Sequence, residues 1–324
     1  MSYKPPFTIT SKMLNLVGDI VEIIAEIKHL ESNLNIPKLR KKNRIKSITG
    51  TLQIEGNSFS EEKVTNVING KKVLGTMREI AEVKGAIKAY EYLDKYVFNK
   101  EADLLYAHKL MTEELLTNAG SYRHLNASVG SNNIVTHIAP SPFQVPELMG
   151  NLFEWLENTK EHPLIVSCVF HYEFEFIHPF SDGNGRIGRL WQSVILTHYK
   201  KLFGFIPIES VVRDNQEAYY KVLEDSGSAG ESTPFIEFML EVIFESLQKV
   251  GNKVGNKVGD YLSDNQKLIV QSMSENPKIS AQKLSDIVGI SVRKIEENIS
   301  KLKEMKVIDR ADGTRGYWEV LNGE

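Results

Sequence analysis

Twelve consecutive residues carry the most specific pattern of this 324-residue chain: His178-Pro179-Phe180-Ser181-Asp182-Gly183-Asn184-Gly185-Arg186-Ile187-Gly188-Arg189. The proline and the glycines at 183 and 185 predict a tight loop, because both residue types interrupt helices. The stretch before it, 164–176, is apolar and is predicted to be a buried helix, and 186–199 has helical periodicity again. We therefore expect a glycine-containing loop at a helix N-terminus, where successive backbone N–H groups bind anions.

Charged side chains in this stretch favour phosphate chemistry. Arg186 and Arg189 are three residues apart, so they project from one side of the helix. Asp182 offers a hard oxygen ligand for Mg²⁺, and His178 is a candidate general base because histidine exchanges protons near neutral pH. Each of these features alone usually has a structural role. Nine specified residues within one twelve-residue window are not expected by chance and therefore indicate a functional site. Together they indicate nucleotidyl or phosphoryl transfer.

These residues resemble the signature of the Fic family, His-Pro-Phe-x-Asp/Asn-Gly-Asn-Gly-Arg-x-x-Arg, at every specified position. The resemblance implies a mostly helical enzyme that transfers AMP from ATP to a protein hydroxyl and releases pyrophosphate. It implies that His178 deprotonates a Ser, Thr or Tyr hydroxyl and that Asp182 holds Mg²⁺ between the α- and β-phosphates. The other implied roles are an anion hole of Gly183, Asn184 and Gly185, with Asn184 also on the α-phosphate, Arg186 near the β-phosphate, Arg189 on the γ-phosphate and Phe180 anchoring the loop.

A second region resembles the β-hairpin flap of the same family, which in that family pairs with the main chain of a target. Turn residues at Asn132-Asn133 predict a short hairpin within 126–138, preceded by Gly120-Ser121-Tyr122-Arg123. The resemblance implies that four flap residues line the nucleotide and the acceptor, and these are Val135, Thr136, His137 and Ile138. Tyr219, beside Tyr220 in a helix predicted over 217–225, matches a position near adenine, with core packing as the alternative.

The segment Thr51-Leu52-Gln53-Ile54-Glu55-Gly56 resembles the inhibitory motif of the family, Ser/Thr-x-x-x-Glu-Gly/Asn. It lies at the end of a helix predicted over about 38–56, which Gly56 ends with a left-handed cap. The resemblance implies that Glu55 pairs with Arg189 and misplaces the triphosphate of ATP, so that the enzyme inhibits itself. The alternative is a solvated glutamate at a helix end. Some related enzymes use this glutamate to remove AMP, which stays open here.

Helical periodicity predicts helices through most of residues 1–248. The resemblance implies that 1–100 form an N-terminal helical region with the inhibitory helix and that 101–248 form a Fic catalytic core. Met77 to Phe98 is predicted to be one long helix, and Ser58 with Glu61 a capping box. His171, on the apolar helix before the motif, is expected to be a hydrogen-bonded core histidine, and Cys168 a small buried hydrophobe.

Residues 249–260 repeat Lys-Val-Gly-Asn, and their glycines predict a non-helical linker. Residues 261–324 follow the order of a winged helix-turn-helix domain, with helices over 265–273, 280–288 and 291–305, a strand from Val307, a turn at Asp312-Gly313 and a return strand over 317–321. DNA binding and a protein-interaction or dimerisation role both remain open, because 10 basic residues face 11 acidic ones between 260 and 324.

Composition is that of a globular protein, with 41% hydrophobic and 25% charged residues, which excludes a collagen-like or disordered chain. The net charge of −3 gives no global basic field for nucleic acid or membrane. One cysteine, no visible signal peptide and no long apolar window lead us to expect a cytoplasmic protein that does not engage a membrane. We also expect a homo-oligomer.

The fold class expected is mainly α: a Fic-type helical bundle with a small β-hairpin flap, plus a C-terminal winged-helix domain. The function expected is a self-inhibited protein adenylyltransferase that uses ATP and Mg²⁺ and modifies a hydroxyl of a protein target or of itself. One alternative is a DNA-binding transcriptional regulator whose Fic body senses nucleotide. The other keeps the enzyme and changes the donated group to UMP, phosphate or phosphocholine.

Overall fold

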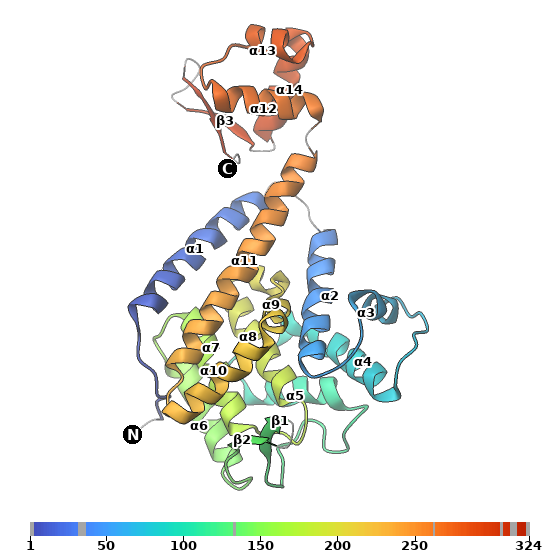
Figure 1. The fold of residues 1–324 in the computed structure, drawn as a ribbon, viewed down its shortest axis with the longest axis vertical. Coiled ribbons are helices and arrows are strands. Elements are labelled where there is room, and N and C mark those ends of the chain that lie inside the picture. Colours follow the sequence, from blue (N-terminus) through green and yellow to red (C-terminus); the bar gives the residue numbers. More distant parts are fainter. Residues whose placement is uncertain are drawn as a thin grey trace. The chain divides into compact units, whose positions relative to one another are not determined.

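The computed structural model describes residues 3–31, 37–131, 134–261, 263–304, 307–311 and 316–321. Within these ranges the chain is mostly helical, and its strands pair into two small two-stranded sheets (Figure 1). The predicted mainly α fold with a small β-hairpin is confirmed. The chain divides into two compact units, Met1–Glu22 with Ile36–Leu247 and Ile23–Asn35 with Gln248–Glu324, and helices α1 and α11 run across that division.

The elements up to the end of α11 are α1 (Ser11–Glu31), α2 (Pro37–Ile54), α3 (Glu61–Ile68), α4 (Met77–Glu91), the 3-10 turn η1 (Leu93–Lys95), α5 (Glu101–Thr112), β1 (Ser128–Ser131), β2 (Ile134–Ile138), α6 (Val145–Asn158), α7 (Pro163–Ile177), α8 (Asn184–Tyr199), η2 (Lys201–Phe205), α9 (Ile208–Asp214), α10 (Gln216–Ala229) and α11 (Thr233–Tyr261). Beyond them lie α12 (Asp264–Glu275), α13 (Ala281–Val288), α14 (Val292–Glu304), β3 (Ile308–Arg310) and β4 (Trp318–Val320).

Helices α7 and α8 form the centre of the first unit and pack along one another. Both are buried around most of their circumference, because other elements cover them on nearly every side. Ile187, Leu190 and Trp191 of α8 are fully buried, as are Val169 and Phe170 of α7. The short connection between the two helices, residues 178–183, is the motif loop, and its two ends are therefore fixed by the core.

Two glycines allow other helices of this unit to touch at backbone distance. A β-carbon at Gly50 of α2 would lie 2.8 Å from the backbone of Glu209 in α9, and one at Gly85 of α4 would collide with the carbonyl oxygen of Met111 in α5. Helix α9 is absent from the sequence expectations because it has only seven residues, too few for a periodic pattern to stand out. It matters because it supports the helix that carries Glu55.

The end of α2 agrees with the prediction, since Gly56 adopts φ +86° directly after the helix. The predicted capping box of Ser58 with Glu61 is wrong. Ser60 caps α3, while the Ser58 hydroxyl donates to Glu79 Oε1 at 2.6 Å. The box that does form joins Thr76 and Glu79 at the start of α4. A Ser-x-x-Glu spacing fits several neighbouring starts, and tertiary contact with Glu79 decides between them.

The single helix expected from Met77 to Phe98 is also wrong, because α4 ends at Glu91 and the 3-10 turn η1 follows. The Tyr96 hydroxyl donates to the Ala89 carbonyl at 3.1 Å, which satisfies an acceptor of the last turn of α4. The rings of Tyr92 and Tyr96 pack with centroids 5.1 Å apart. This aromatic packing replaces the hydrogen bonds of a longer helix.

The non-helical linker predicted over 249–260 is wrong, since α11 continues as a helix to Tyr261. A four-residue repeat is close to the 3.6 residues of a helical turn, so its pattern stays nearly in phase with the helix. Extending a helix that already exists also requires no new nucleus.

The predicted hairpin is confirmed. Strands β1 and β2 are antiparallel, pairing Ser128 with Ile138 and Ser131 with Ile134, and the register shifts between Val129 and Gly130. The turn expected at Asn132-Asn133 lies outside the described residues. Strand β2 packs against α10, which brings the hairpin to the motif loop's end of the helical body (Figure 1).

The C-terminal elements follow the predicted order of three helices and a two-stranded hairpin. Ser280 and Ser291 cap the second and third helices, and Gly289 makes the turn between them with φ +73°. A separate core holds the module together, and its buried members are Ile269, Met273, Ile279, Leu284, Ile295, Ile299, Leu302, Val307, Ile308 and Trp318. The turn expected at Asp312-Gly313 lies outside the described residues.

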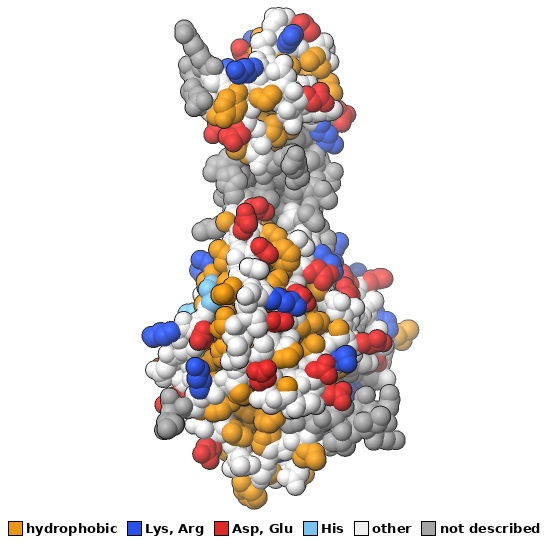
Figure 2. Space-filling model, turned by 60° about the vertical axis from the view of Figure 1, so that its left-hand side comes forward, with side chains coloured by type: hydrophobic (Ala, Val, Ile, Leu, Met, Phe, Trp, Pro, Cys, Tyr) orange, Lys and Arg blue, Asp and Glu red, His pale blue; other side chains and the backbone are white. Residues whose placement is uncertain are grey.

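The surface view shows acidic and basic side chains interspersed among hydrophobic patches, with neither sign of charge forming a continuous field on this face (Figure 2). This agrees with the net charge of −3. Among the described residues, no helix combines the length and the apolar character that spanning a bilayer requires.

Candidate functional site

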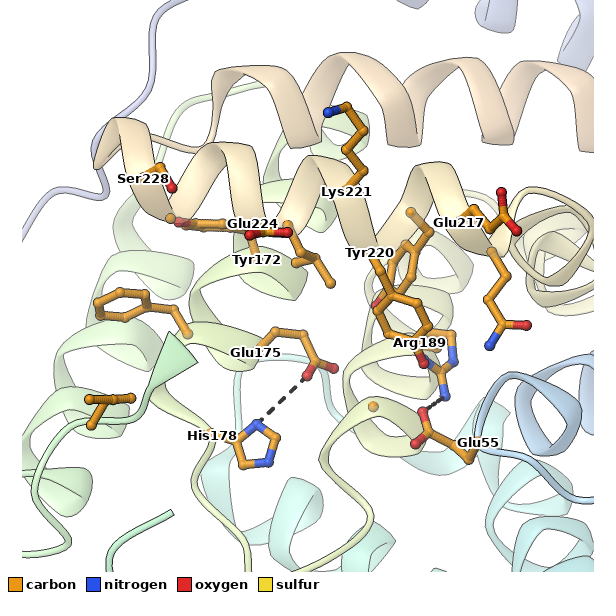
Figure 3. Close-up of a pocket in the computed structure, with 17 residues that line it drawn as sticks. Glu55, Tyr172, Glu175, His178, Arg189, Glu217, Tyr220, Lys221, Glu224 and Ser228 are labelled. Carbon is orange, nitrogen blue, oxygen red and sulfur yellow. Dashed lines mark hydrogen bonds and ion pairs between the residues drawn. The ribbon is translucent and has the colours of Figure 1, made fainter. Parts of the chain in front are cut away.

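A cleft of about 1130 Å³ opens in the first unit where α7 ends (Figure 3). Glu175 and His178 reach it from α7, Gly185 and Arg189 from α8, and Glu55 from the end of α2. Helix α10 forms one wall. The remaining lining residues are Ile138, Tyr172, Phe176, Gln216, Glu217, Tyr219, Tyr220, Lys221, Leu223, Glu224, Gly227 and Ser228.

His178 ends α7 in a left-handed backbone conformation, with φ +50°. It is the one non-glycine residue with a positive φ in the described part of the chain. Its N–H donates to the Phe174 carbonyl at 2.9 Å, and its own carbonyl accepts from Arg123 Nε at 2.8 Å. This conformation costs an L-residue about 1–2 kcal/mol, and such strain is typical of functional sites. It turns the imidazole into the cleft (Figure 3).

The motif loop is closed by its own side chains. Asn184 Oδ1 accepts from the Phe180 N–H and Asn184 Nδ2 donates to the Phe180 carbonyl, both at 2.8 Å. The Phe180 ring is fully buried and stacks on His108, with centroids 3.7 Å apart. Gly183 caps α8 with φ +85°. Because both polar atoms of the Asn184 amide hold the loop, a contact of this residue with phosphate would come from its backbone N–H.

Two residues that the sequence analysis did not assign hold this loop from outside. Arg123 Nη1 and Nη2 donate to the carbonyls of Leu125 and Pro140, in addition to the bond from Nε to His178. His108 Nδ1 accepts from the Gly120 N–H at 2.9 Å, so its proton lies on Nε2, which donates to the Asp182 carbonyl at 3.0 Å. Burial lowers the pKa of His108 to about 4, which keeps this ring neutral.

Asp182 lies at the centre of a charge network. Its Oδ2 accepts from Arg78 Nη2 at 2.8 Å, and its Oδ1 accepts from Arg186 Nη2 at 3.0 Å. Glu82 joins the same two arginines, 3.1 Å from Arg78 Nε and 3.8 Å from Arg186 Nη1. Arg186 is buried, whereas Arg78 is exposed and reaches Asp182 from the start of α4. Arg78 could not be identified from the sequence, since no local pattern marks it.

Arg189 is buried and its guanidinium is held by the end of α2. Nε donates to Thr51 Oγ1 at 3.0 Å, and Nη2 donates to Glu55 Oε1 at 2.6 Å. Although burial lowers it, the pKa of Arg189 is raised overall by Glu55, so the guanidinium stays charged. Gly185 lies directly beneath this pair, because a β-carbon there would collide with Glu55 Oε1. The ion pair is therefore packed against the first turn of α8 (Figure 3).

His171 and Tyr219 are buried and hydrogen-bonded behind the cleft. His171 Nδ1 lies 2.8 Å from Gln192 Oε1, and its Nε2 lies 3.1 Å from the Tyr219 hydroxyl. Burial lowers the pKa of His171 to about 3. The core role predicted for His171 is confirmed, as is the burial of Cys168. Tyr220 is the more exposed tyrosine of α10, and its hydroxyl donates to the Ile54 carbonyl at 3.2 Å.

The flap residues assigned by resemblance lie in β2, but the side chains of Val135, Thr136 and His137 are outside the described part of the structure. Ile138 is described, and it lines the cleft while remaining 78% exposed. The strand therefore runs along the mouth of the cleft.

The residues around Asp182 fit a magnesium ion that is shared with phosphate. In the described part of the chain no three His, Cys, Asp or Glu side chains come together as a metal site. Mg²⁺ is commonly held by one or two carboxylates with phosphate oxygens and water as the other ligands. Asp182 supplies such a carboxylate, and it is one third exposed. Arg78 would have to yield one carboxylate oxygen.

Two protein-family models match the chain. Residues 97–196 match "Fic/DOC family", and residues 262–309 match "Winged helix-turn-helix DNA-binding". Among curated proteins, "Protein adenylyltransferase Fic" of Aedes aegypti is 26% identical over 223 residues, 65% of this chain and 42% of that protein. "Protein adenylyltransferase fic-1" of Caenorhabditis elegans is 27% identical over 253 residues, 74% and 47% of the two chains. The chain thus spans less than half the length of these relatives.

Solved structures give a likeness that includes nearly the whole chain. A Fic family protein from Desulfovibrio desulfuricans G20 is 38% identical, covers 99% of both chains and superposes with a TM-score of 0.75. Fic-1 (aa134 - 508) from Caenorhabditis elegans has a TM-score of 0.62 at 19% identity, covering 75% of this chain and 74% of the other, and shows the likeness of the fold alone.

Proposed function

This chain belongs to the Fic family, and on that premise we propose that it is a self-inhibited protein adenylyltransferase. It transfers AMP from ATP to a Ser, Thr or Tyr hydroxyl of a protein and releases pyrophosphate. The observation that carries the proposal is the convergence of His178, Gly185 and Arg189 on one cleft, with Arg186 and Asp182 on the same motif loop and helix start. The protein relatives named adenylyltransferase support the same reaction class.

The roles follow from where the side chains lie. His178 takes the proton of the acceptor hydroxyl, because its ring lies in the cleft at the end of α7. The N-terminal turn of α8 offers backbone N–H groups and the buried cation Arg186 to the phosphates. Asp182 would hold Mg²⁺, which supplies charge neutralisation for the phosphates when bound. Arg189 receives the terminal phosphate.

Self-inhibition follows from the partner that Arg189 already has. Glu55 occupies the guanidinium at 2.6 Å, so a γ-phosphate and the carboxylate compete for one cation. A charge-assisted hydrogen bond contributes about 1.5–3 kcal/mol, which corresponds to a bias of about ten- to a hundredfold. The inhibitory role does not depend on whether Glu55 also aligns a water molecule that removes AMP from a modified target.

The test uses ATP labelled on the α-phosphate, with Mg²⁺ and the full chain. Glu55→Gly is expected to raise label transfer by about ten- to a hundredfold, and His178→Ala in the same background is expected to abolish it. Glu62→Gly is the matched control, because Glu62 is exposed in the first turn of α3 and lies outside the cleft. Equal incorporation by the wild type and Glu55→Gly would contradict the inhibitory role.

The donated group is identified by the intact mass of Glu55→Gly after incubation with ATP and Mg²⁺. A gain of one AMP unit on the protein itself or on an added target supports adenylyl transfer. A gain of one phosphate from ATP would support the alternative of a kinase-like relative. UTP and CDP-choline offered in parallel test the UMP and phosphocholine alternatives. The pairing of Arg189 with a carboxylate favours a triphosphate in this position.

The C-terminal part is a winged helix-turn-helix domain, and this favours a DNA-binding regulator as the second candidate function. The charges of its third helix weigh against strong binding, because Arg293 lies 3.3 Å from Glu297 along α14. Arg310 stacks on Trp318 at 4.5 Å. A gel shift with DNA, unaccompanied by any His178-dependent transfer from labelled ATP, would support the regulator over the enzyme.

A further inference from the structure

Glu175 lies in the cleft beside His178, and the proposed reaction has not assigned it a role. It precedes His178 by three residues on α7, so the two side chains project from neighbouring positions of one helix face. Its Oε2 lies 4.0 Å from His178 Nδ1, and Figure 3 shows the carboxyl and the imidazole pointing toward one another. Hydrogen bonds in a catalytic site are often this long until substrate binds.

This carboxyl is largely shielded from solvent, although it lines the cleft. Its side chain keeps only 12% of its exposure, and Oε1 has no hydrogen-bond partner among the described residues. Gly188 of α8 leaves the room that it occupies, because a β-carbon there would lie 2.7 Å from Oε1. Burying a carboxyl without full hydrogen bonding is costly. A side chain with a purely structural role at this place would therefore be apolar.

Several charged or titratable groups face Glu175 from the elements packed around it. They are His171 and His178 of α7, Arg189 of α8, Glu55 after α2, and Tyr219 and Tyr220 of α10. Burial raises the pKa of Glu175 to about 8, Arg189 acts in the opposite direction, and Glu55 adds to the rise. The carboxyl thus changes its charge close to neutral pH.

The orientation of His178 defines which nitrogen meets the substrate. Its Nδ1 is buried and faces Glu175, while the side chain as a whole keeps 19% of its exposure. The accessible edge of the ring therefore carries Nε2. A base that acts through Nε2 needs its own proton on Nδ1, since neutral imidazole carries one proton.

We propose that Glu175 is the positioning residue of His178. The carboxylate accepts from Nδ1–H, which fixes the tautomer whose Nε2 is unprotonated, and it balances the positive charge of the imidazolium. This rests on the proposed adenylyl transfer. In that step the hydroxyl oxygen forms a bond to the α-phosphorus, the bond from the α-phosphorus to the bridging oxygen breaks, and pyrophosphate leaves. The hydroxyl proton moves to Nε2, and Glu175 itself takes up no proton.

The pH dependence follows from the charge that Glu175 must carry. Its ionised fraction rises with pH until the pKa is passed, so transfer should rise by up to about tenfold per pH unit below that point. In the Glu55→Gly background we expect the rate of transfer to rise with pH in a limb that lies below pH 8. The reason is that this variant lacks the repulsion by Glu55 that contributes to the raised pKa of Glu175. Measurements from pH 6 to 9 include the limb.

Two variants in the Glu55→Gly background separate the roles of charge and hydrogen bonding. Glu175→Gln keeps an acceptor but no charge, and it is expected to lower kcat by tenfold or more, since a positioned base contributes about 10²–10⁴-fold, and to flatten the pH limb with the KM for ATP unchanged. Glu175→Asp is expected to restore the limb in part. Glu173→Gln is the control, because Glu173 bonds to Tyr3 instead. An unchanged kcat and pH limb in Glu175→Gln would overturn the proposal.

A second readout needs no transfer and so separates this proposal from the reaction class. The ¹⁵N shifts of the His178 ring, assigned by their loss in His178→Ala, report which nitrogen is protonated. At pH 9, where the Glu175 carboxyl is ionised, wild type is expected to hold the proton on Nδ1. Glu175→Met, which removes the acceptor at similar length, is expected to give mixed tautomers at the same pH. Identical ¹⁵N shifts in wild type and Glu175→Met would refute the pairing, whether or not the protein transfers AMP.

Discussion

Asp182 is engaged on both carboxylate oxygens, by the exposed Arg78 on one side and the buried Arg186 on the other. A metal ion at this carboxylate must compete with Arg78, because Arg186 cannot move out of the core as readily. An exposed ion pair contributes about 0.2–1 kcal/mol. Arg78 therefore competes weakly with a metal ion at the proposed magnesium site, although it lies 104 residues earlier in the chain than the aspartate.

We predict that Arg78→Ala strengthens the binding of Mn²⁺, used as a probe in place of Mg²⁺, by about 1.5- to 5-fold in the presence of a non-hydrolysable ATP analogue. The free ion is measured by electron paramagnetic resonance. Lys84→Ala on the same exposed helix is the control, since Lys84 pairs with Glu114 and not with Asp182. Equal Mn²⁺ affinity in wild type and Arg78→Ala would rule out the competition.

At the scale of single residues, the sequence predicts those functional residues that are neighbours along the chain. The motif from His178 to Arg189 could be identified because its chemistry is written in consecutive residues. Arg78, His108 and Arg123 could not, because each reaches the loop from another element and carries no local pattern that marks it. Their role depends on the packing of α4, of α5 and of the segment before the hairpin.

Helix α2 presents Glu55 to Arg189, and its placement depends on how closely it approaches α9. Gly50 sets that approach, because a β-carbon would lie 2.8 Å from backbone atoms of Glu209 and Ser210. Backbone atoms cannot rotate away as a side-chain end can, so a larger residue must displace a helix. The placement of Glu55 beside Arg189 thus depends on the absence of a β-carbon at Gly50.

We predict that Gly50→Ala lowers the free energy of unfolding by about 1–3 kcal/mol, the usual cost of overpacking a core. Gly18→Ala in α1 is the matched control: a β-carbon there meets nothing within 4 Å, and removal of a helix-interior glycine is expected to add about 0.5–1 kcal/mol. Urea denaturation of the two variants checks the signs. Loss of stability in Gly18→Ala but not in Gly50→Ala would contradict the packing argument.

Elements with long periodic patterns, such as α7 and α8, were predictable. Two of the errors share a cause, since each lies where tertiary contact overrides local preference. Tyr96 ends α4 early through its bond to Ala89, and Glu79 takes Ser58 away from the cap of α3. The glycine repeat remains helical because α11 already exists before it and the repeat period matches the helix.

At the scale of the whole molecule, the described residues form two separate cores, one around α7 and α8 and one in the winged helix-turn-helix domain. Ile295 lies fully buried in the second core. The order of the C-terminal elements was predictable because each is short, capped and punctuated by glycine. The ligand of this domain was not predictable, because nearly equal numbers of basic and acidic residues exclude neither DNA nor a protein partner.

We predict that Ile295→Ala destabilises the winged helix-turn-helix domain by at least about 2 kcal/mol, which accelerates its amide hydrogen exchange by about 30-fold. Exchange over 164–199 and transfer in the Glu55→Gly background are expected to stay unchanged, because the cores are distinct. Ile287→Ala is the control, as Ile287 is half exposed on α13. A parallel loss of protection in α7 and α8 would show instead that the two cores unfold together.

The left-handed backbone at position 178 favours glycine for stability, whereas the proposed reaction requires the imidazole of histidine. Glycine would adopt the same φ without the steric cost of a β-carbon, so removing the imidazole in this way relaxes the main chain. The substitution that most completely silences the base is thus one that the fold accepts readily. In a lineage that no longer used the reaction, position 178 would drift toward glycine while the protein remained folded and abundant. An inactive descendant of this chain would persist as a binding protein.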